Sequence, residues 1–349
     1  MLIHPNNSLF PVKSEARIPT STFKNVIFFL IMILISMSQI WSIGGGKGGT
    51  GKSFIAGNLG IILAKQGYKT LLIDVDFGAA NLHTIIGISK PERSISDFLN
   101  RRLGSLDDTV VPTPIPNLYL ISGAMNNLDI ANLTHQQKLK LLRNIARLSY
   151  DYILLDIGAG TSFNTIDYFM VADSGIFVTT PEPTSIENVY RFIRSAYFRK
   201  IHHVLKAHDF RTLAEEAERK NGNATVSNPE ILLQVIKEMD AEKGDIVEKA
   251  LRTLDFKLIL NQLRKQDNPN IGELICKIIA RHLALKMSFI GNISFDDHVH
   301  SSVCKKLPFV DLYPYTRTAL DLRECCKNHL SISINQTSIN QTIKRNSTD

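Results

Sequence analysis

The chain has 349 residues, of which 44% are apolar and 21% charged, so it can bury a full core and is not disordered as a whole. Its formal net charge of +7 fits either an ordinary solvated surface, which we favour, or attraction to an anionic partner such as nucleic acid or lipid head groups. The spacing of its four cysteines matches neither a zinc site nor a redox C-x-x-C pair, which favours reduced thiols in a cytosolic protein.

Residues 1–36 form an N-terminal extension ahead of the first predicted strand. Its apolar run, Val26–Ile35, is shorter than the roughly 20 residues that span a bilayer. Basic residues precede this run, as in a secretion signal: Lys13, Arg17 and Lys24. A signal, a membrane anchor and an extension outside the native protein stay open. We favour the last, because a core strand begins directly after Met37.

From Ile40 onward, short apolar runs alternate with longer segments of helical spacing. Strands are predicted at Ile40–Ile43, Thr70–Ile73, Leu118–Ile121, Tyr152–Leu155, Gly175–Thr179, Lys257–Leu260 and Met287–Ile293. Helices are predicted at Ser53–Gln66, Thr134–Leu148, Ser185–Leu205 and Ile271–Leu285. Several strand runs are apolar throughout, which is typical of a parallel sheet covered on both faces. The alternation predicts an α/β fold, a three-layer, doubly wound and mostly parallel sheet.

This fold is expected to occupy residues 37–330 as one domain. Residues 207–250 break the alternation, because they are charged and helical in tendency without a clear strand. We interpret them as a helical insertion on the sheet edge. Residues 331–349 are rich in Ser, Asn, Gln and Thr and lack the apolar spacing of a membrane-binding helix, so we expect a disordered tail.

The strongest local signal fits the phosphate-loop (Walker A) pattern G-x-x-x-x-G-K-[ST], between a predicted strand and a predicted helix. Its candidate phosphate-binding residues are Gly46, Lys47, Gly48, Gly49, Thr50, Gly51, Lys52 and Ser53. The glycines allow backbone N–H groups to point at a phosphate, and the helix N-terminus adds positive potential. We expect Lys52 to reach the β- and γ-phosphates of ATP, and the Ser53 hydroxyl to bind Mg²⁺.

Carboxylates end two of the predicted strands. Asp74 and Asp76 follow one apolar run, and Asp156 ends another ahead of Gly158 and Gly160. Ligands gather at the carboxyl ends of strands in open parallel sheets. We expect Asp156 to hold Mg²⁺ through water, and Asp74 to hold either its own loop or the Mg²⁺ shell.

These motifs together resemble the MinD/ParA superclass of deviant-Walker ATPases, in which the loop reads K-G-G-x-G-K-[ST]. The resemblance implies that Lys47 contacts the nucleotide of a partner subunit in an ATP-sandwich homodimer. It also implies that Asp76 orients the attacking water and that Asn81 senses the γ-phosphate. The form D-x-G-A-G that begins at Asp156 is similar to the FlhG/FleN branch, which controls flagellar number.

Downstream residues extend the resemblance over Ile40–Leu330. Val178–Glu187 is similar to the strand, turn and helix that follow the second switch loop in the FlhG-like branch. Asn261 stands where the family has an asparagine that reads adenine, and an amide can both donate to and accept from a base edge. The segment from Ile293 resembles the family's I-P-x-D loop beside the base, with Ser294 in place of proline.

The resemblance implies a cytoplasmic ATPase that dimerises with ATP and Mg²⁺ to control the position or number of a cell structure such as a flagellum, a pole or a division site. An activating protein partner is implied, and the inner face of the membrane is a candidate docking surface. A ParA-like partitioning ATPase stays an alternative. It would use the basic residues Arg191, Arg194, Arg199 and Lys200, although we favour a solvated basic face there.

Other ATP-dependent classes fit less well. A metal-cluster carrier needs cysteines near the second switch loop, and a bacterial tyrosine kinase needs tyrosines in the C-terminal tail, which has none. Lys47 argues against an amidoligase, because that group generally lacks this lysine.

Overall fold

The structure, a computed structural model, describes residues 38–123, 133–207, 229–283 and 285–346. The apolar run of the N-terminal extension and the proposed start at Met37 lie outside these residues. Among the helices that the structure describes, none is long and apolar enough to cross a membrane.

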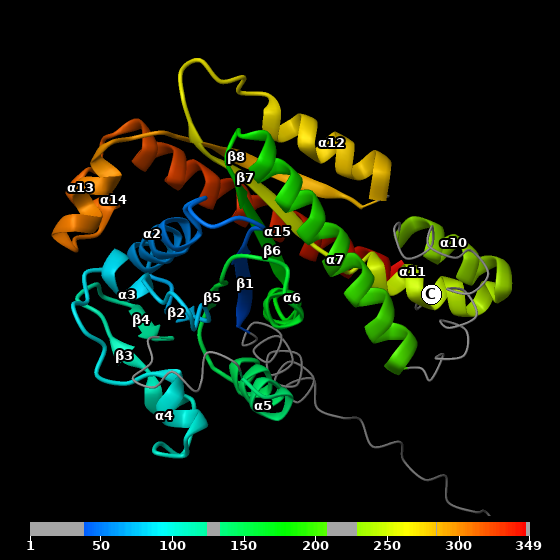
Figure 1. Cartoon of the computed structure of the whole chain (residues 1–349), viewed down its shortest axis with the longest axis horizontal. Helices are drawn as coiled ribbons and strands as arrows, with labels where there is room; N and C mark the ends of the chain where they lie inside the picture. Colours follow the sequence, from blue (N-terminus) through cyan, green and yellow to red (C-terminus); the bar gives the residue numbers. More distant parts are fainter. Residues whose placement is uncertain (1–37, 124–132, 208–228, 284, 347–349) are drawn as a thin grey trace, which may run out of the picture. The chain divides into compact units, whose positions relative to one another are not determined.

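An eight-stranded sheet forms the centre of the described region (Figure 1), in the order β3-β4-β2-β5-β1-β6-β7-β8. The strands are β1 (Gln39–Gly44), β2 (Thr70–Asp74), β3 (Val111–Pro112), β4 (Leu118–Ile121), β5 (Tyr152–Asp156), β6 (Ser174–Thr179), β7 (Phe256–Leu263) and β8 (Met287–Ser294). All neighbouring pairs are parallel except the short edge strand β3, which is antiparallel to β4. The predicted mostly parallel, doubly wound sheet is therefore confirmed.

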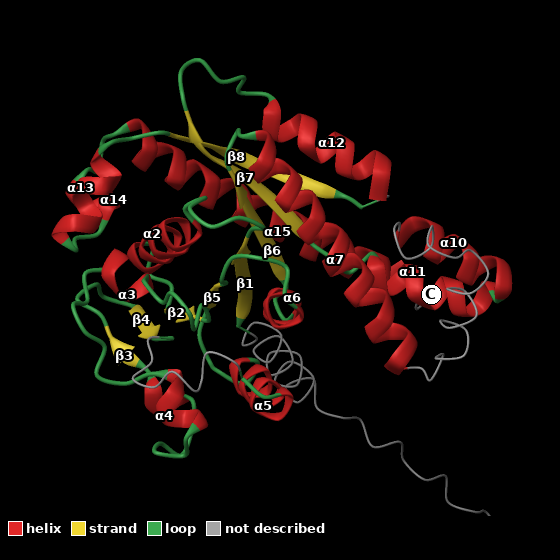
Figure 2. Ribbon diagram, viewed as in Figure 1, coloured by secondary structure: helices red, strands yellow, loops and turns green. Residues whose placement is uncertain are grey.

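Helices cover both faces of this sheet (Figure 2), because alternate strand residues point to opposite sides. In β2, Leu71 and Ile73 enter one buried cluster and Leu72 enters the other. The first cluster is closed by α4 (Ile95–Leu99), α5 (His135–Ile145), α6 (Phe163–Met170), α7 (Pro183–Ala207) and α12 (Ile271–Leu283). The second is closed by α2 (Lys52–Lys65), α3 (Leu82–Ile85), α13 (His298–Lys305), α14 (Phe309–Leu312) and α15 (Arg317–Asn346). A short 3₁₀ turn, η1, spans Asp107–Thr109.

The insertion is helical over the part that the structure describes. Its helices α10 (Pro229–Met239) and α11 (Ala241–Leu251) pack against each other and on α7, and α10 also contacts α12. Leu232, Ile236 and Val247 are buried there in the same cluster as the α7 side chains. The apolar faces of these helices are thus buried against other helices, and the expected place on the sheet edge stays a prediction.

The C-terminal segment also differs from the expectation of disorder. Helix α15 continues to Asn346, past the predicted boundary at Ser331. Its first turns are anchored by Leu322, Cys325 and Cys326, which are buried in the second cluster. Once packing has nucleated a helix, each further residue adds a backbone hydrogen bond at low cost, which explains a helix that polar composition alone did not predict.

Candidate functional site

The predicted phosphate loop joins β1 to α2 at the carboxyl end of the sheet. Gly51 is the N-cap of α2 and has φ 90° and ψ 22°, a left-handed conformation that residues with side chains rarely adopt. A Cβ at this position would lie only 2.3 Å from the Nδ2 atom of Asn261. Glycine is therefore required here both by the turn and by the close approach of β7.

Lys52 lies inside the loop, with only 8% of its surface exposed. Its Nζ donates a hydrogen bond of 3.2 Å to the backbone oxygen of Lys47. Burial lowers the pKa of Lys52, and the nearby carboxylates of Asp156 and Asp76 oppose that shift. A partly desolvated cation above the N-terminus of a helix is the arrangement that binds phosphate oxygens.

Asp156 is the strongest sign of a cation site. It is 1% exposed, and neither carboxylate oxygen has a hydrogen-bond partner among the residues that the structure describes. Burial and the neighbouring Asp74 raise its pKa, and the Ser53 hydroxyl and Lys52 oppose that shift, although Ser53 lies outside hydrogen-bond geometry. Two buried, unpaired carboxylate oxygens are costly unless a cation satisfies them. With the Ser53 hydroxyl nearby, these oxygens fit Mg²⁺, which takes oxygen ligands and keeps several waters.

Asp74 is equally buried but is hydrogen-bonded. Its two oxygens accept from the backbone N–H groups of Asp76 and Leu82, each at 3.1 Å. Burial raises its pKa to about 7 against these hydrogen bonds. Of the two roles expected for Asp74, these contacts favour holding the loop. That loop carries Asn81, which is exposed at the start of α3.

The two switch loops, distant in sequence, meet at Asp76. The half-buried Asp76 lies against Gly158, where a Cβ would be only 3.0 Å from the Asp76 Cγ atom. A cavity of about 240 Å³ opens beside them. It is lined by Val75, Asp76, Phe77, Gly78, Leu133, Ile157, Gly158, Ala159, Ser162, Asn164, Thr165 and Tyr168. The expected catalytic carboxylate thus stands next to a space that can hold water.

Lys47 differs from Lys52 in its surroundings. It is exposed, and its Nζ donates a hydrogen bond of 3.2 Å to Thr184 Oγ1 in the first turn of α7. The preceding Gly46 lies so close to α7 that a Cβ would be 2.2 Å from the backbone oxygen of Asn188. The part of the loop at Gly46 and Lys47 thus packs against α7, while the Lys47 ammonium group faces solvent.

The end of β7 braces the loop from the other side. Asn261 donates from Nδ2 to the Thr50 oxygen at 2.8 Å, and Gln262 donates from Nε2 to the Gly49 oxygen at 3.0 Å. Sequence reasoning singled out Asn261 for adenine, which stays a prediction, and missed both the bracing contact and Gln262. The signal available for Gln262 was its place directly after Asn261 at a strand end.

The loop after β8 is held by α15. The backbone N–H and the hydroxyl of Ser294 both donate to Asp321 Oδ2, at 2.9 and 2.7 Å, and Arg317 pairs with the other oxygen at 2.8 Å. Ser294 stands where the ATPases that this chain resembles have proline. A hydrogen-bonded serine therefore restrains the backbone that a proline ring would restrain covalently.

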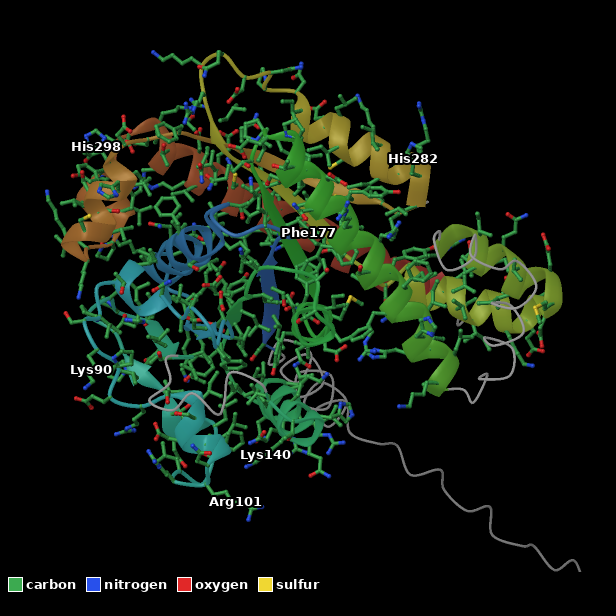
Figure 3. All side chains as sticks on the ribbon, viewed as in Figure 1. Lys90, Arg101, Lys140, Phe177, His282 and His298 are labelled. Atoms are coloured by element: carbon green, nitrogen blue, oxygen red, sulfur yellow. The ribbon has the colours of Figure 1, made fainter. Side chains whose placement is uncertain are left out.

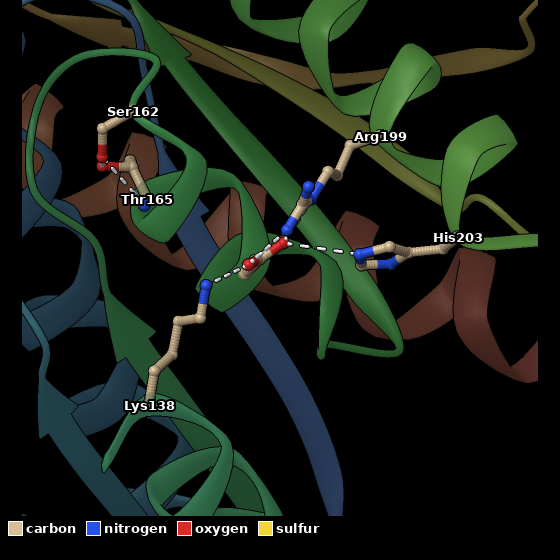
Figure 4. Close-up of polar contacts among 6 residues, drawn as sticks. Lys138, Ser162, Thr165, Arg199 and His203 are labelled. Carbon is tan, nitrogen blue, oxygen red and sulfur yellow. Dashed lines mark hydrogen bonds and ion pairs between the residues drawn. The ribbon is translucent and has the colours of Figure 1, made fainter. Parts of the chain in front are cut away.

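A buried charge cluster, missed in the sequence, lies behind the second switch loop (Figure 4). Asp167 of α6 accepts hydrogen bonds from Lys138 of α5 and from Arg199 of α7, and His203 lies 3.8 Å away. Burial alone would raise the pKa of Asp167, but the hydrogen bonds from Arg199 and Lys138 outweigh it and lower that pKa. The three helices are therefore joined at one carboxylate.

The cluster also changes the interpretation of the basic stripe on α7. Arg199 is bound to Asp167, and Arg191 forms an exposed pair with Glu187 at 2.6 Å. Lys200 is half-buried, which lowers its pKa. The basic residues at these positions, predicted to form a solvated face, are thus partly engaged in contacts within the chain.

Comparisons with known proteins agree with this geometry. The family model described as "CobQ/CobB/MinD/ParA nucleotide binding domain" matches residues 41–309. The antiactivator FleN of Pseudomonas aeruginosa is 22% identical over 284 residues, which are 81% of this chain and 82% of FleN. The flagellum site-determining protein YlxH of Helicobacter pylori is 34% identical over 151 residues, 43% of this chain and only 50% of YlxH.

Among solved structures, the septum site-determining protein MinD of Pyrococcus horikoshii, complexed with Mg-ADP, superposes with a TM-score of 0.59 at 20% identity. That match covers 85% of this chain and 98% of MinD, and at this identity it shows the fold. The family match spans most of the chain and includes the whole phosphate loop and both switch loops. The chain therefore belongs to the CobQ/CobB/MinD/ParA nucleotide-binding family and is a P-loop ATPase.

Proposed function

We propose that this ATPase is a positioning or number-control switch, which dimerises when it binds ATP and Mg²⁺ and separates after hydrolysis. The observation that carries the proposal is the exposed ammonium group of Lys47 beside a loop whose other lysine, Lys52, is buried. A cation that the loop's own phosphate site does not enclose can serve the nucleotide of a second copy. Such a contact across an interface makes dimerisation depend on the phosphates present.

The other site residues take complementary roles in this proposal. Lys52 binds the β- and γ-phosphates, and Asp156 with Ser53 holds Mg²⁺, which neutralises phosphate charge when bound. Asp76 orients the attacking water, while Asp74 keeps the Asp76 loop in place. Asn81 senses the γ-phosphate and Asn261 reads adenine. The assignment of Asp156 is supported by its two oxygens, which have no hydrogen-bond partner among the described residues. That of Asp76 is supported by the cavity beside it.

We favour flagellar placement or number as the cell process, although several other relatives are named septum site-determining proteins. FleN is named as an antiactivator and YlxH as a flagellum site-determining protein. We propose that this chain acts in the cytoplasm or at the inner face of the membrane, with a protein partner that stimulates hydrolysis. A ParA-like role in DNA partitioning is less well supported, because Arg191 and Arg199 are already paired with Glu187 and Asp167.

The mass of the full chain in solution, by light scattering, tests this proposal. We expect a monomer with ADP and a dimer with ATP and Mg²⁺. Lys47→Ala should stay monomeric with ATP, whereas Asp76→Ala should dimerise with ATP but not hydrolyse it. As a matched control, Lys90→Ala removes an exposed lysine at the surface (Figure 3) and should behave as the unaltered chain.

The opposite results are equally informative. A dimer of Lys47→Ala with ATP would remove the proposed role of Lys47 across the interface. One mass with both nucleotides would leave the ATP site standing and reject the switch.

A further inference from the structure

The outer face of helix α12 carries exposed apolar side chains. The helix packs on β7, β8 and α7 with its other side, through Gly272, Ile275, Ile279 and Leu283. On the outer face, Leu274 and Ile278 are 54% and 44% exposed. They are four positions apart, so they lie next to each other on the helix surface. One exposed leucine is ordinary, but two adjacent apolar side chains form a patch that is open to solvent.

Basic residues lie on the same face. Lys277 and Arg281 follow Leu274 by three and seven positions and are both exposed, so they share one stripe of the helix with the apolar pair. Within the residues that the structure describes, no ion pair engages either of these cations. The one acidic residue of α12, Glu273, lies in its first turn, where the helix dipole favours a negative charge. The face therefore presents free positive charge beside apolar surface.

The place of α12 in the fold keeps this face apart from the candidate nucleotide site. The helix lies at the periphery of the layer of helices (Figure 1), beside β7 and the edge strand β8. The switch loops follow β2 and β5, which lie on the other side of β1 in the sheet. A surface that docks on the outer face of α12 therefore leaves the switch loops accessible.

Apolar side chains between two cations on one helix face fit an anionic lipid bilayer. The apolar side chains of such a helix enter the boundary between head groups and acyl chains, and the cations beside them attract anionic head groups. Nucleic acid is a poorer match, because its phosphates are bound by cations and polar side chains, which leaves an exposed leucine and isoleucine without a role.

We propose that the outer face of α12 docks the protein on an anionic lipid bilayer. Leu274 and Ile278 enter the head-group region, and Lys277 and Arg281 contact lipid phosphates. This proposal rests on the membrane location proposed above, and it names the surface that makes the contact.

Docking through so small a patch is weak and reversible. A cation close to an anionic membrane contributes about 1 kcal/mol, or about 5-fold in affinity, so Lys277 and Arg281 together contribute about 25-fold. The apolar pair adds to this, but it is far smaller than the roughly 20 apolar residues of a spanning helix. The contact can therefore form and break repeatedly, which fits a protein proposed to alternate between two states.

Tryptophan fluorescence at α12 tests the proposal in the full chain. The chain's one tryptophan, Trp41, is 1% exposed, so Leu274→Trp adds a reporter on the outer face without a competing signal from the surface. We expect its emission to shift to shorter wavelength with vesicles of equal parts phosphatidylglycerol and phosphatidylcholine, and not with phosphatidylcholine alone. Adding Lys277→Gln and Arg281→Gln should raise the vesicle concentration that gives half of this shift by about 25-fold.

Two controls match these variants. Lys90→Gln with Arg101→Gln removes two exposed cations elsewhere (Figure 3) and should leave the shift of the α12 reporter unchanged. Tyr315→Trp places a reporter at a position that is 90% exposed between α14 and α15, and its emission should not shift.

The reporter is local, so membrane contact by another part of the chain, or a protein as the true partner of α12, would leave Leu274→Trp silent with anionic vesicles and overturn the proposal. An equal shift of Tyr315→Trp, or a shift that Lys277→Gln and Arg281→Gln do not weaken, would overturn it too. The mass of the same variants with ATP reports on the proposed switch alone. It should equal that of the unaltered chain whether or not α12 binds lipid.

Discussion

At the scale of single residues, the nucleotide site brings two carboxyl groups together in a buried place. Asp74 and Asp156 are almost fully buried, and Lys52 at the start of α2 acts as a counter-charge to Asp156. Burial favours the neutral form of such carboxyl groups and raises their pKa. Ionising them in the folded chain therefore lowers the free energy of unfolding until a cation binds.

This arrangement predicts a pH dependence of stability. The pKa of Asp74 is about 7 in the folded chain, and that of Asp156 is also raised, so the folded state holds more protons than the unfolded state near pH 5 to 7. Linkage then requires the free energy of unfolding to fall as pH rises through the folded pKa. We expect the Tm of the nucleotide-free chain to be several degrees higher at pH 5.5 than at pH 7.5.

Two controls belong to this thermal melt. Saturating Mg²⁺ and ADP should shrink the difference between the two pH values, because bound Mg²⁺ stabilises the ionised carboxylates. Asp74→Asn should shrink it too. A Tm that rises with pH in the nucleotide-free chain would show that other groups dominate.

The phosphate loop could be predicted because its residues are contiguous and each has a fixed task. Thr184, Gln262 and Tyr168 could not, since each is one polar residue in an ordinary helix or strand end. Only the topology brings them to the site: Thr184 reaches Lys47 because α7 begins beside the loop. Contacts that depend on which elements are neighbours leave little local pattern, and the place of Gln262 directly after Asn261 was the one signal among these residues.

At the scale of helices and strands, strand positions were predicted well because buried parallel strands are short and apolar throughout. The edge strand β3 (Val111–Pro112) was missed, since two residues make no periodic pattern. Helix α6 was also missed, because it is only one segment of eight residues after a glycine-rich loop. Its capping residue Ser162, whose hydroxyl accepts from the Thr165 N–H, was the available signal.

The charge cluster at Asp167 predicts unequal effects for two ion pairs. Lys138 and Asp167 have side chains only 5% and 6% exposed, whereas those of Arg191 and Glu187 are 62% and 60% exposed. Removing Lys138 takes one of two charged hydrogen-bond donors from the buried Asp167 and leaves Arg199 as the other. Lys138→Met should therefore lower the free energy of unfolding by about 3 kcal/mol, and Glu187→Gln by less than about 1 kcal/mol.

Urea denaturation of both variants gives this comparison directly. Equal midpoints for Lys138→Met and Glu187→Gln would mean that Arg199 alone satisfies Asp167. The lysine would then be replaceable in α5.

At the scale of the whole described region, the helical insertion is attached to the layer of helices and not to the nucleotide site. Ile236 of α10 is fully buried in the cluster shared with α7. Replacing a buried isoleucine by alanine costs about 2–5 kcal/mol. We expect Ile236→Ala to lower stability by about this amount while the affinity for ADP stays unchanged, as measured by melting and by titration calorimetry. A weaker affinity for ADP would instead connect the insertion to the phosphate loop through α7.

The brace from β7 has a consequence for how the protein is made. The hydrogen bond from Asn261 to Thr50 joins residues 211 positions apart. At about 5–20 residues per second, a ribosome needs roughly 10–40 s after the phosphate loop to synthesise β7, the strand that braces it. A nascent chain therefore contains the complete phosphate motif well before β7 can brace it.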